Sequence, residues 1–289
     1  MKAGFWVAPE GAEEAIALVP IGGPLAEDAK RGVTGTGALS FLATTSAEGM
    51  IARCPGVARL LPEIVEALNR QMENGAGILF DLDTLSDEEV SLVGEVLGEG
   101  EVAATVALPD GVTAQIRESV LAGLWRVRFT DASGVLIADY VEVSAIPQAV
   151  RRAATMTRAA LSFGEVPEGA MNVMPVLAEI RDRALAHEPG APAHIISLSL
   201  LPMSPEDISH LVATLGIGPI RIVSKGYGTC RIQATAIHNV WSVQFFNAMD
   251  TILLDTIEIG DTPVVAIAAT EDFRDSAERL KEIEEAYFK

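Results

Sequence analysis

The stretch LSDEEVSLVGEVLG at residues 85–98 returns in related form as MSPEDISHLVATLG at residues 203–216. In each stretch a serine, Ser86 or Ser204, is followed three residues later by an acidic residue, which predicts a helix N-cap with a capping box. The first copy has a glutamate there and the second an aspartate, which is the weaker version. The final glycine of each stretch is typical of a helix end. One capped helix is therefore predicted at two places in the chain.

The similarity between the two parts of the chain continues downstream of this helix. Identical residues lie 116 positions apart at Ile116 and Ile232, Trp125 and Trp241, Val127 and Val243, Phe129 and Phe245, Asp139 and Asp255, Glu142 and Glu258, and Pro147 and Pro263. Two of the three tryptophans thus occupy equivalent places. Such self-similarity indicates a duplication, with units near residues 55–155 and 168–275.

Both units have the same order of predicted elements. A proline, Pro62 or Pro175, opens a helix, because its missing N–H is not needed in a first turn. A short apolar strand, at residues 78–82 or 195–200, and the capped helix follow. The hydrophobic period then changes from 3.6 to 2 residues, which predicts strands in residues 102–143 and 220–259. The expected fold class is α+β, with two similar tandem units that each pack helices on a mostly antiparallel β-sheet.

This organisation divides the chain into three parts. We expect an N-terminal segment at residues 1–54, a first α+β repeat at 55–160, and a second repeat with a C-terminal helix at 168–289. Within the first part, residues 32–47 are rich in Gly, Thr, Ser and Ala and carry no charge, which is typical of a flexible segment. The amphipathic helix expected at residues 272–287 would pack against the second repeat.

Composition excludes several classes of protein. The 289 residues carry a net charge of −19 without clustered Lys or Arg, so nucleic acid is excluded as a direct partner. No uncharged apolar stretch approaches about 18 residues, which argues against a membrane span. The N-terminus lacks the pattern of a signal peptide, and the two distant cysteines, Cys54 and Cys230, fit a reducing compartment. We therefore expect a cytoplasmic protein.

Motifs that carry chemistry are missing from the sequence. The four histidines form no paired zinc motif, and neither C-x-x-C nor G-x-S-x-G occurs. The pairs Asp139 with Glu142 and Asp255 with Glu258 point to opposite faces of a strand, so they favour a structural role over acid–base catalysis. We expect no enzyme, with no catalytic residue, cofactor or metal.

Two features are candidates for binding a partner. Residues 81–101 contain eight acidic residues and no basic one. The helix dipole accounts for the three in the first helical turn. Five others could meet a basic partner, namely Asp81, Asp83, Glu95, Glu99 and Glu101. The second candidate is Tyr227, an aromatic residue between two glycines at the tip of a predicted turn.

Six stretches together resemble a known family. They are LGEGEV at 97–102, GLWRVR at 123–128, MNVMP at 171–175, GYG at 226–228, IQAT at 232–235 and EDFRDSAERL at 271–280. In this order they are similar to the HupH/HyaF/HoxQ family of hydrogenase expression proteins over about residues 55–285. The resemblance implies an accessory protein for the assembly of uptake nickel–iron hydrogenases, and it transfers no catalytic residues.

The same resemblance implies partners. It points to a dedicated chaperone that binds the hydrogenase small-subunit precursor, which carries a twin-arginine leader, before export. A thioredoxin-like companion of the HyaE/HoxO type is the expected second partner. A mobile segment or exposed apolar patches could recognise such an unfinished client.

Two other functions remain open. A small-molecule enzyme could have its site in the cleft between the repeats, which a deep pocket with a strongly shifted titrating residue would indicate. A cluster-handling or redox accessory could use Cys54 or Cys230 across a homodimer. Replacement of both cysteines by serine without loss of hydrogenase maturation would exclude that second alternative.

Overall fold

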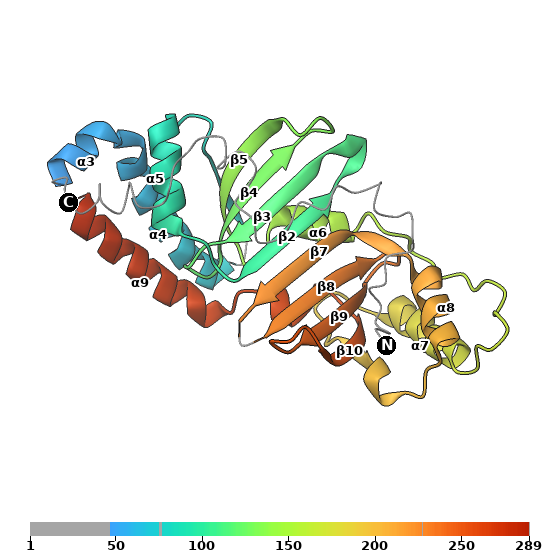
Figure 1. The fold of residues 1–289 in the computed structure, drawn as a ribbon. Coiled ribbons are helices and arrows are strands. Elements are labelled where there is room, and N and C mark those ends of the chain that lie inside the picture. The colour runs from blue at the N-terminus through green and yellow to red at the C-terminus, as the bar shows by residue number, and fades with distance from the viewer. Residues whose placement is uncertain (1–46, 75–76, 227, 289) are drawn as a thin grey trace. The chain divides into compact units, whose positions relative to one another are not determined.

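The computed structural model describes residues 47–74, 77–226 and 228–288 (Figure 1). The helices are α3 (Ala47–Arg53), α4 (Pro55–Asn74), α5 (Asp87–Leu97), α6 (Gln148–Ala154), α7 (Val173–Ala186), α8 (Pro205–Leu215) and α9 (Thr270–Tyr287), with short 3₁₀ helices η2 (Pro109–Gly111), η3 (Leu198–Leu200) and η4 (Val264–Ala266). The strands are β1 (Ile78–Asp81), β2 (Val102–Ala107), β3 (Thr113–Glu118), β4 (Leu124–Thr130), β5 (Leu136–Val143), β6 (His194–Ser197), β7 (Ile217–Lys225), β8 (Thr229–Thr235), β9 (Val240–Phe246) and β10 (Ile252–Ile259).

The two repeats have the same strand topology. In the first, the strands pair in the order β1-β5-β4-β3, and the equivalent order in the second is β6-β10-β9-β8, with β7 next to β8. All of these pairs are antiparallel. The register also agrees, because Trp125 lies opposite Glu142 and Trp241 lies opposite Glu258. The prediction of an α+β fold with antiparallel sheets in two similar repeats is confirmed.

The capped helices form as the sequence predicts. Ser86 before α5 and Ser204 before α8 each accept the N–H of the third helical residue, at 3.3 and 3.1 Å, and both capping boxes are complete. Gly98 and Gly216 end these helices with φ of 60° and 66°. This backbone conformation strains residues with a Cβ, which explains why both helices stop at glycine.

Several element boundaries differ from the sequence predictions. Helix α7 begins at Val173, so Pro175 is its third residue rather than its first. Helix α4 begins at Pro55, so Pro62 lies in its interior rather than at its start. The apolar side chains of Val57, Leu61, Ile64 and others along α4 are fully buried, and this packing outweighs the backbone hydrogen bond that an interior proline removes. In the second repeat the strand expected as far as Leu200 ends at Ser197, because the chain turns there into η3.

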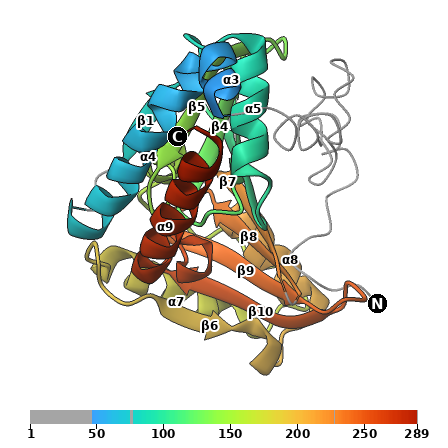
Figure 2. The same cartoon turned by 90° about the vertical axis from the view of Figure 1, so that its left-hand side faces the viewer.

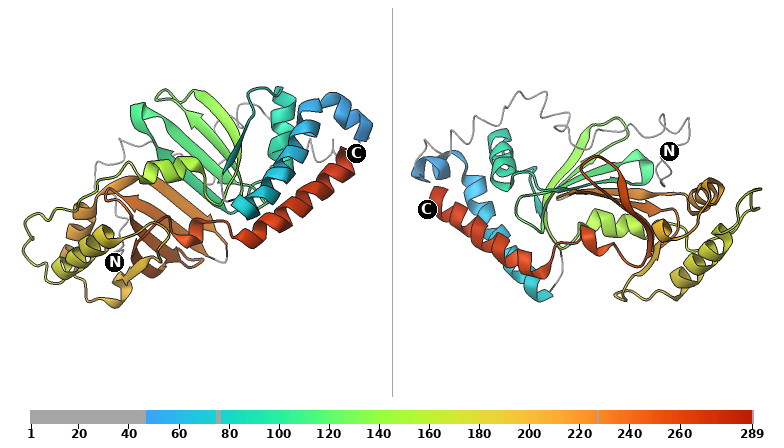
Figure 3. Two further views of the ribbon diagram at one scale, coloured as in Figure 1. Left: turned by 180° about the vertical axis from the view of Figure 1, so that it is seen from behind. Right: turned by 60° about the horizontal axis from the view of Figure 1, so that its bottom comes forward.

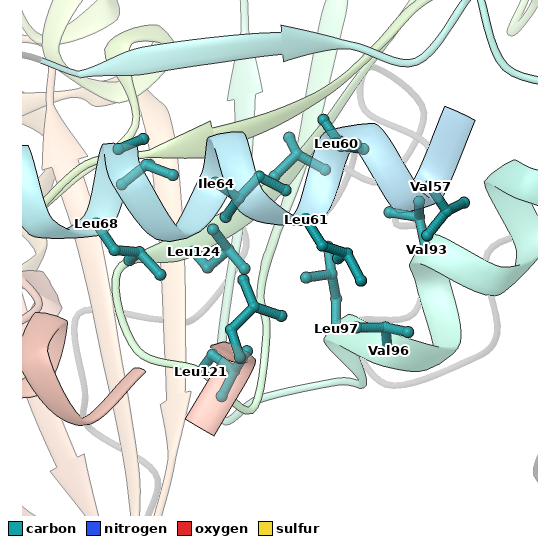
Figure 4. Close-up of a cluster of buried hydrophobic side chains, with 14 of the residues drawn as sticks. Val57, Leu60, Leu61, Ile64, Leu68, Val93, Val96, Leu97, Leu121 and Leu124 are labelled. Atoms are coloured by element: carbon teal, nitrogen blue, oxygen red, sulfur yellow. The ribbon is translucent and has the colours of Figure 1, made fainter. Parts of the chain in front are cut away.

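The chain forms two compact units, and one of them contains most of the first repeat together with residues 268–288. Its core joins α4, α5 and the segment at Leu121 to Leu124 (Figure 4). Helix α9 runs beside α4 in every view of this unit (Figures 2 and 3). The α9 side chains of Phe273, Ala277 and Leu280 are buried in this core.

The prediction that the C-terminal helix packs against the second repeat is therefore wrong. An amphipathic pattern shows that a helix has one apolar face but does not show which core receives it. Tight contacts fix the position of α9, since Ser276 Oγ donates to the Ala122 carbonyl at 2.9 Å. A Cβ at Gly123 would also lie 2.3 Å from the Phe273 ring.

The other compact unit contains residues 104–111 and 149–267. Helices α7 and α8 cover one end of its sheet. The apolar core between them contains buried residues from both helices and from the strands, namely Val173, Val176, Leu177, Ile180, Ile196, Leu211, Leu215, Val240, Ile257 and Ile259. Apart from Leu161, which precedes the second repeat, the buried residues of this core belong to the second repeat, in contrast to the core that contains α9.

Candidate interaction surface

The described residues contain neither a group that could bind a metal ion nor a helix that could span a membrane. Within 47–74, 77–226 and 228–288 no three His, Cys, Asp or Glu side chains form a group that could hold a metal ion. In the same part of the chain no helix is long and apolar enough to span a bilayer. A candidate site must therefore be sought among titratable groups and exposed surfaces.

The thiols of Cys54 and Cys230 are free and buried. Burial raises the pKa of Cys54, and the carboxylates of Glu88 and Glu89 add to that effect. Burial, followed by the charge of Glu258, raises the pKa of Cys230 to about 12. Because the thiolate is the reactive form, both groups are poor nucleophiles and poor metal ligands at neutral pH.

The carboxylates at the third position of the capped helices hold neighbouring backbone. Glu89 Oε1 accepts the Gly56 N–H at 2.6 Å, at the start of α4. Asp207 Oδ1 accepts the N–H groups of Met171, Asn172 and Val173 at 2.8–3.0 Å, at the start of α7. Although burial opposes ionisation, these bonds and those from the cap serine lower the pKa of both carboxyls. The aspartate version is thus not the weaker one, because it accepts more backbone N–H bonds.

The aspartates of the sheet are engaged with their neighbours. Asp139 accepts hydrogen bonds from Arg126 at 2.8 and 3.1 Å and from Arg128 at 3.2 Å. The equivalent Asp255 accepts one from the Gln244 amide at 3.0 Å. These contacts agree with the structural role expected for the sheet aspartates.

The five acidic candidates do not form one surface. Glu99 is exposed and pairs with Arg117 at 2.6 Å. Asp81 accepts the N–H of Asp83 at 2.9 Å, and both are exposed, as is Glu101. Both carboxylate oxygens of Glu95 are buried without a hydrogen-bond partner among the described residues, and burial raises its pKa. Tyr227, the sixth candidate, lies outside the described residues.

A row of three side chains crosses each sheet at the same place. In the first repeat Glu142 lies between Trp125 of β4 and Leu79 of β1. In the second repeat Glu258 lies between Trp241 of β9 and Ile195 of β6. Residues directly opposite each other in antiparallel strands share one face of the sheet, so each glutamate touches an aliphatic residue of the edge strand.

Both tryptophans of these rows are core residues. They are almost fully buried, and Trp125 Nε1 donates to the Ser144 carbonyl at 2.8 Å. Trp241 Nε1 donates to the Gly260 carbonyl at 3.3 Å. The tryptophan is therefore held in the same way in both rows, and the rows differ in the surroundings of the glutamate and the edge-strand residue.

Several aliphatic side chains on and next to β6, η3 and β10 of the second repeat are exposed. Strand β6 pairs with β10, and η3 contacts β10 through a 2.9 Å hydrogen bond from the Asp255 N–H to Ser199 Oγ. Figure 2 shows β6 beside β10 at this end of the sheet. The exposed residues on these elements, here called the apolar edge, are Ile195, Leu200, Leu201, Leu253 and Leu254.

Sequence reasoning missed the apolar edge. The edge strands align with an offset of 116, since Ile78 lies opposite Val143 and His194 lies opposite Ile259, whereas the capped helices align with an offset of 118. The second repeat thus has two extra residues at η3, and Leu200 there is 83% exposed. The change of offset between strand and helix was the available signal.

Comparison with known proteins identifies the family. The model of the HupH hydrogenase expression protein, C-terminal conserved region, matches twice, at residues 56–164 and 170–287. A Hydrogenase expression/formation protein HupH of Rhizobium leguminosarum bv. viciae is 56% identical over 289 residues, which is 100% of both chains.

More distant relatives agree with this match. HoxQ of Cupriavidus necator is 44% identical over 78% of this chain and 79% of its own, and the Hydrogenase-1 operon protein HyaF of Escherichia coli K12 is 35% identical over 80% and 81%. A solved structure of a HupH from Thiobacillus denitrificans is 30% identical, with a TM-score of 0.31 over 33% of this chain and 79% of that one. The match of the family model to both repeats and the identity to the HupH, HoxQ and HyaF sequences show that the chain belongs to the HupH/HyaF/HoxQ family of hydrogenase expression proteins.

Proposed function

We propose that this hydrogenase expression protein is a dedicated chaperone that binds the immature small subunit of an uptake nickel–iron hydrogenase in the cytoplasm. Its client is the precursor that still carries a twin-arginine leader, and a thioredoxin-fold protein of the HyaE/HoxO type acts beside it. The family membership supports the role in hydrogenase maturation. The observation that carries the choice of a binding function is the apolar edge of the second repeat.

A holding protein needs a surface that an unfinished chain can cover. Soluble proteins rarely leave several neighbouring aliphatic side chains in water without a binding purpose. The apolar edge offers such side chains on a rigid sheet edge, with Ile195 57% and Leu200 83% exposed. The raised pKa of both thiols and the structural hydrogen bonds of Asp139 and Asp207 further favour binding over catalysis.

Co-purification tests this function. The full chain, tagged, would be isolated from cells that make the hydrogenase, and bound proteins would be identified by mass spectrometry. We expect the small-subunit precursor with its leader intact, and a strain whose small-subunit gene is deleted provides the control. Recovery of only the large subunit, or of no maturation component, would contradict the proposal.

A further inference from the structure

The two Trp–Glu–aliphatic rows differ in how the glutamate is satisfied. Glu142 is buried and its Oε1 accepts the Gln148 N–H at 2.8 Å. Glu258 is only half-buried, and no donor or cation among the described residues contacts its carboxylate. Burial raises the pKa of Glu258, which means that its surroundings do not compensate the negative charge. A cation supplied from outside would do so.

The edge strand beside Glu258 is open. Within the described part of the chain, β6 pairs only with β10, so one side of its backbone has no strand partner. Proteins commonly protect such edges with charged residues or proline. In the first repeat, Asp81 and Asp83 stand at the end of the equivalent strand β1, whereas β6 is followed by η3 with its exposed Leu200.

These features select one kind of occupant. An open backbone edge binds an extended segment by adding a strand, and side chains of that segment then alternate toward and away from the sheet face. The exposed side chain of Ile195 favours an apolar neighbour on that face. The uncompensated carboxylate of Glu258, opposite Ile195, favours a basic one.

We propose that the β6 edge, with Ile195 along it and Glu258 beside it, binds an extended apolar segment of the client that carries an arginine or lysine. This inference rests on the proposed function, since it places the contact that the small-subunit precursor makes. The bound segment extends the sheet beyond β6, and its basic side chain pairs with Glu258. The equivalent edge in the first repeat makes no such contact, because Glu142 is already satisfied.

Charge and edge variants of the full chain test this surface. Glu258→Gln keeps the shape of the side chain but removes its charge, and we expect it to lower the yield of co-purified small-subunit precursor about tenfold. Ile195→Lys protects the edge with a charge and is expected to abolish capture. The matched control is Leu79→Lys on β1, an exposed residue at the equivalent place, which should capture as much precursor as the unaltered protein.

A second measurement does not depend on variants. Hydrogen exchange of the unaltered chain, alone and with co-purified precursor, should show slower exchange of the backbone amides at residues 194–197 in the complex. If the unaltered chain captures precursor but both variants do so equally and exchange at residues 194–197 is unchanged, this surface is wrong while the proposed function stands. If the unaltered chain captures no precursor, the proposed function fails and this inference fails with it.

Discussion

The two repeats share their buried stabilising contacts and differ at the exposed edge of the sheet. Both have a serine-capped helix and a carboxylate at its third position that accepts backbone N–H groups. Both also have a tryptophan opposite a glutamate on the neighbouring strand. At the edge of the sheet, however, Glu142 in the first repeat accepts the Gln148 N–H, whereas no donor among the described residues contacts the carboxylate of Glu258 in the second. Both edges carry exposed aliphatic side chains, such as Leu79 and Ile195, and the second adds Leu200 of η3. The duplication therefore kept what the fold needs, and the copies diverged at the surface proposed to bind a client.

The source of each core is a second difference between the repeats. Helix α9 completes the core beside α4, whereas the core between α7 and α8 takes its buried residues from the second repeat and from Leu161 just before it. Four changes test how far this comparison holds.

Truncation of Leu280 is expected to have the largest effect. Leu280→Ala would lower the free energy of unfolding by about 2–5 kcal/mol, because it leaves a cavity in the core where the Leu280 side chain is fully buried. Urea unfolding followed by circular dichroism measures this change. The control Leu185→Ala, at a leucine of α7 that is 70% exposed, should stay within about 0.5 kcal/mol of the unaltered protein.

Loss of the Asp207 carboxylate is next in size. Asp207→Ala would leave several backbone N–H groups without an acceptor and cost roughly 3 kcal/mol, more than Glu89→Ala. The pKa of Asp207 is lowered on folding, so its stabilisation is present above the ordinary pKa near 3.8 and is lost as the pH falls. The difference between the urea midpoints of the variant and the unaltered protein should therefore be smaller at pH 3 than at pH 7. A difference that is the same at both pH values would contradict the stabilising role of the ionised Asp207 carboxylate.

Glu118 provides a pH test that the second repeat lacks, since Ala234 occupies the equivalent position. Burial, with smaller contributions from the carboxylates of Asp272 and Glu101, raises the pKa of Glu118 to about 7. The folded protein therefore holds a proton that the unfolded chain loses near pH 4.5, and stability falls as the pH rises from there to about 7.

Glu118→Gln removes this dependence. Relative to the unaltered protein, the variant should gain about 2–3 kcal/mol between pH 5 and pH 8 in its free energy of unfolding. Unfolding in urea at these two pH values gives the comparison. A difference that does not change with pH would show that the group is ionised in the folded state throughout.

The smallest expected effect concerns Gly94 and Arg126, where the small residue leaves room for the large one. A Cβ at Gly94 of α5 would lie 3.0 Å from Arg126 Nη1, and the second repeat has Val212 and Ser242 at the equivalent positions. Gly94→Val should therefore cost about 1 kcal/mol more in the unaltered protein than in an Arg126→Ser background. A double-mutant cycle by urea unfolding measures this coupling, and additive effects would show that the two positions are independent.

Local patterns in the sequence predicted the parts of the fold that depend on local physics. The caps at Ser86 and Ser204, the glycine helix ends and the meander strands follow from residues close together in the chain. The position of α9 could not be predicted this way, because its apolar face fits any core of suitable shape. The same holds for Pro62, since only the packing of the whole α4 face explains a proline inside that helix.

The candidate site was predicted less well. Five acidic residues were selected by their density, but density does not distinguish the buried Glu95 from the paired Glu99. Glu142 and Glu258 are identical in sequence, and only the position of the Gln148 N–H separates them. That difference depends on the path of the loop after the strand, which the sequence pattern does not specify.

Helix α9 has a consequence for how the protein is made. A ribosome delivers the first repeat well before the residues that complete its core, because Phe273 and Leu280 follow all the strands of the second repeat in the sequence. The first repeat must therefore wait, with Leu61 and Leu68 uncovered, until α9 has been synthesised. The second repeat, which needs nothing from downstream, can close while the nascent chain is still attached.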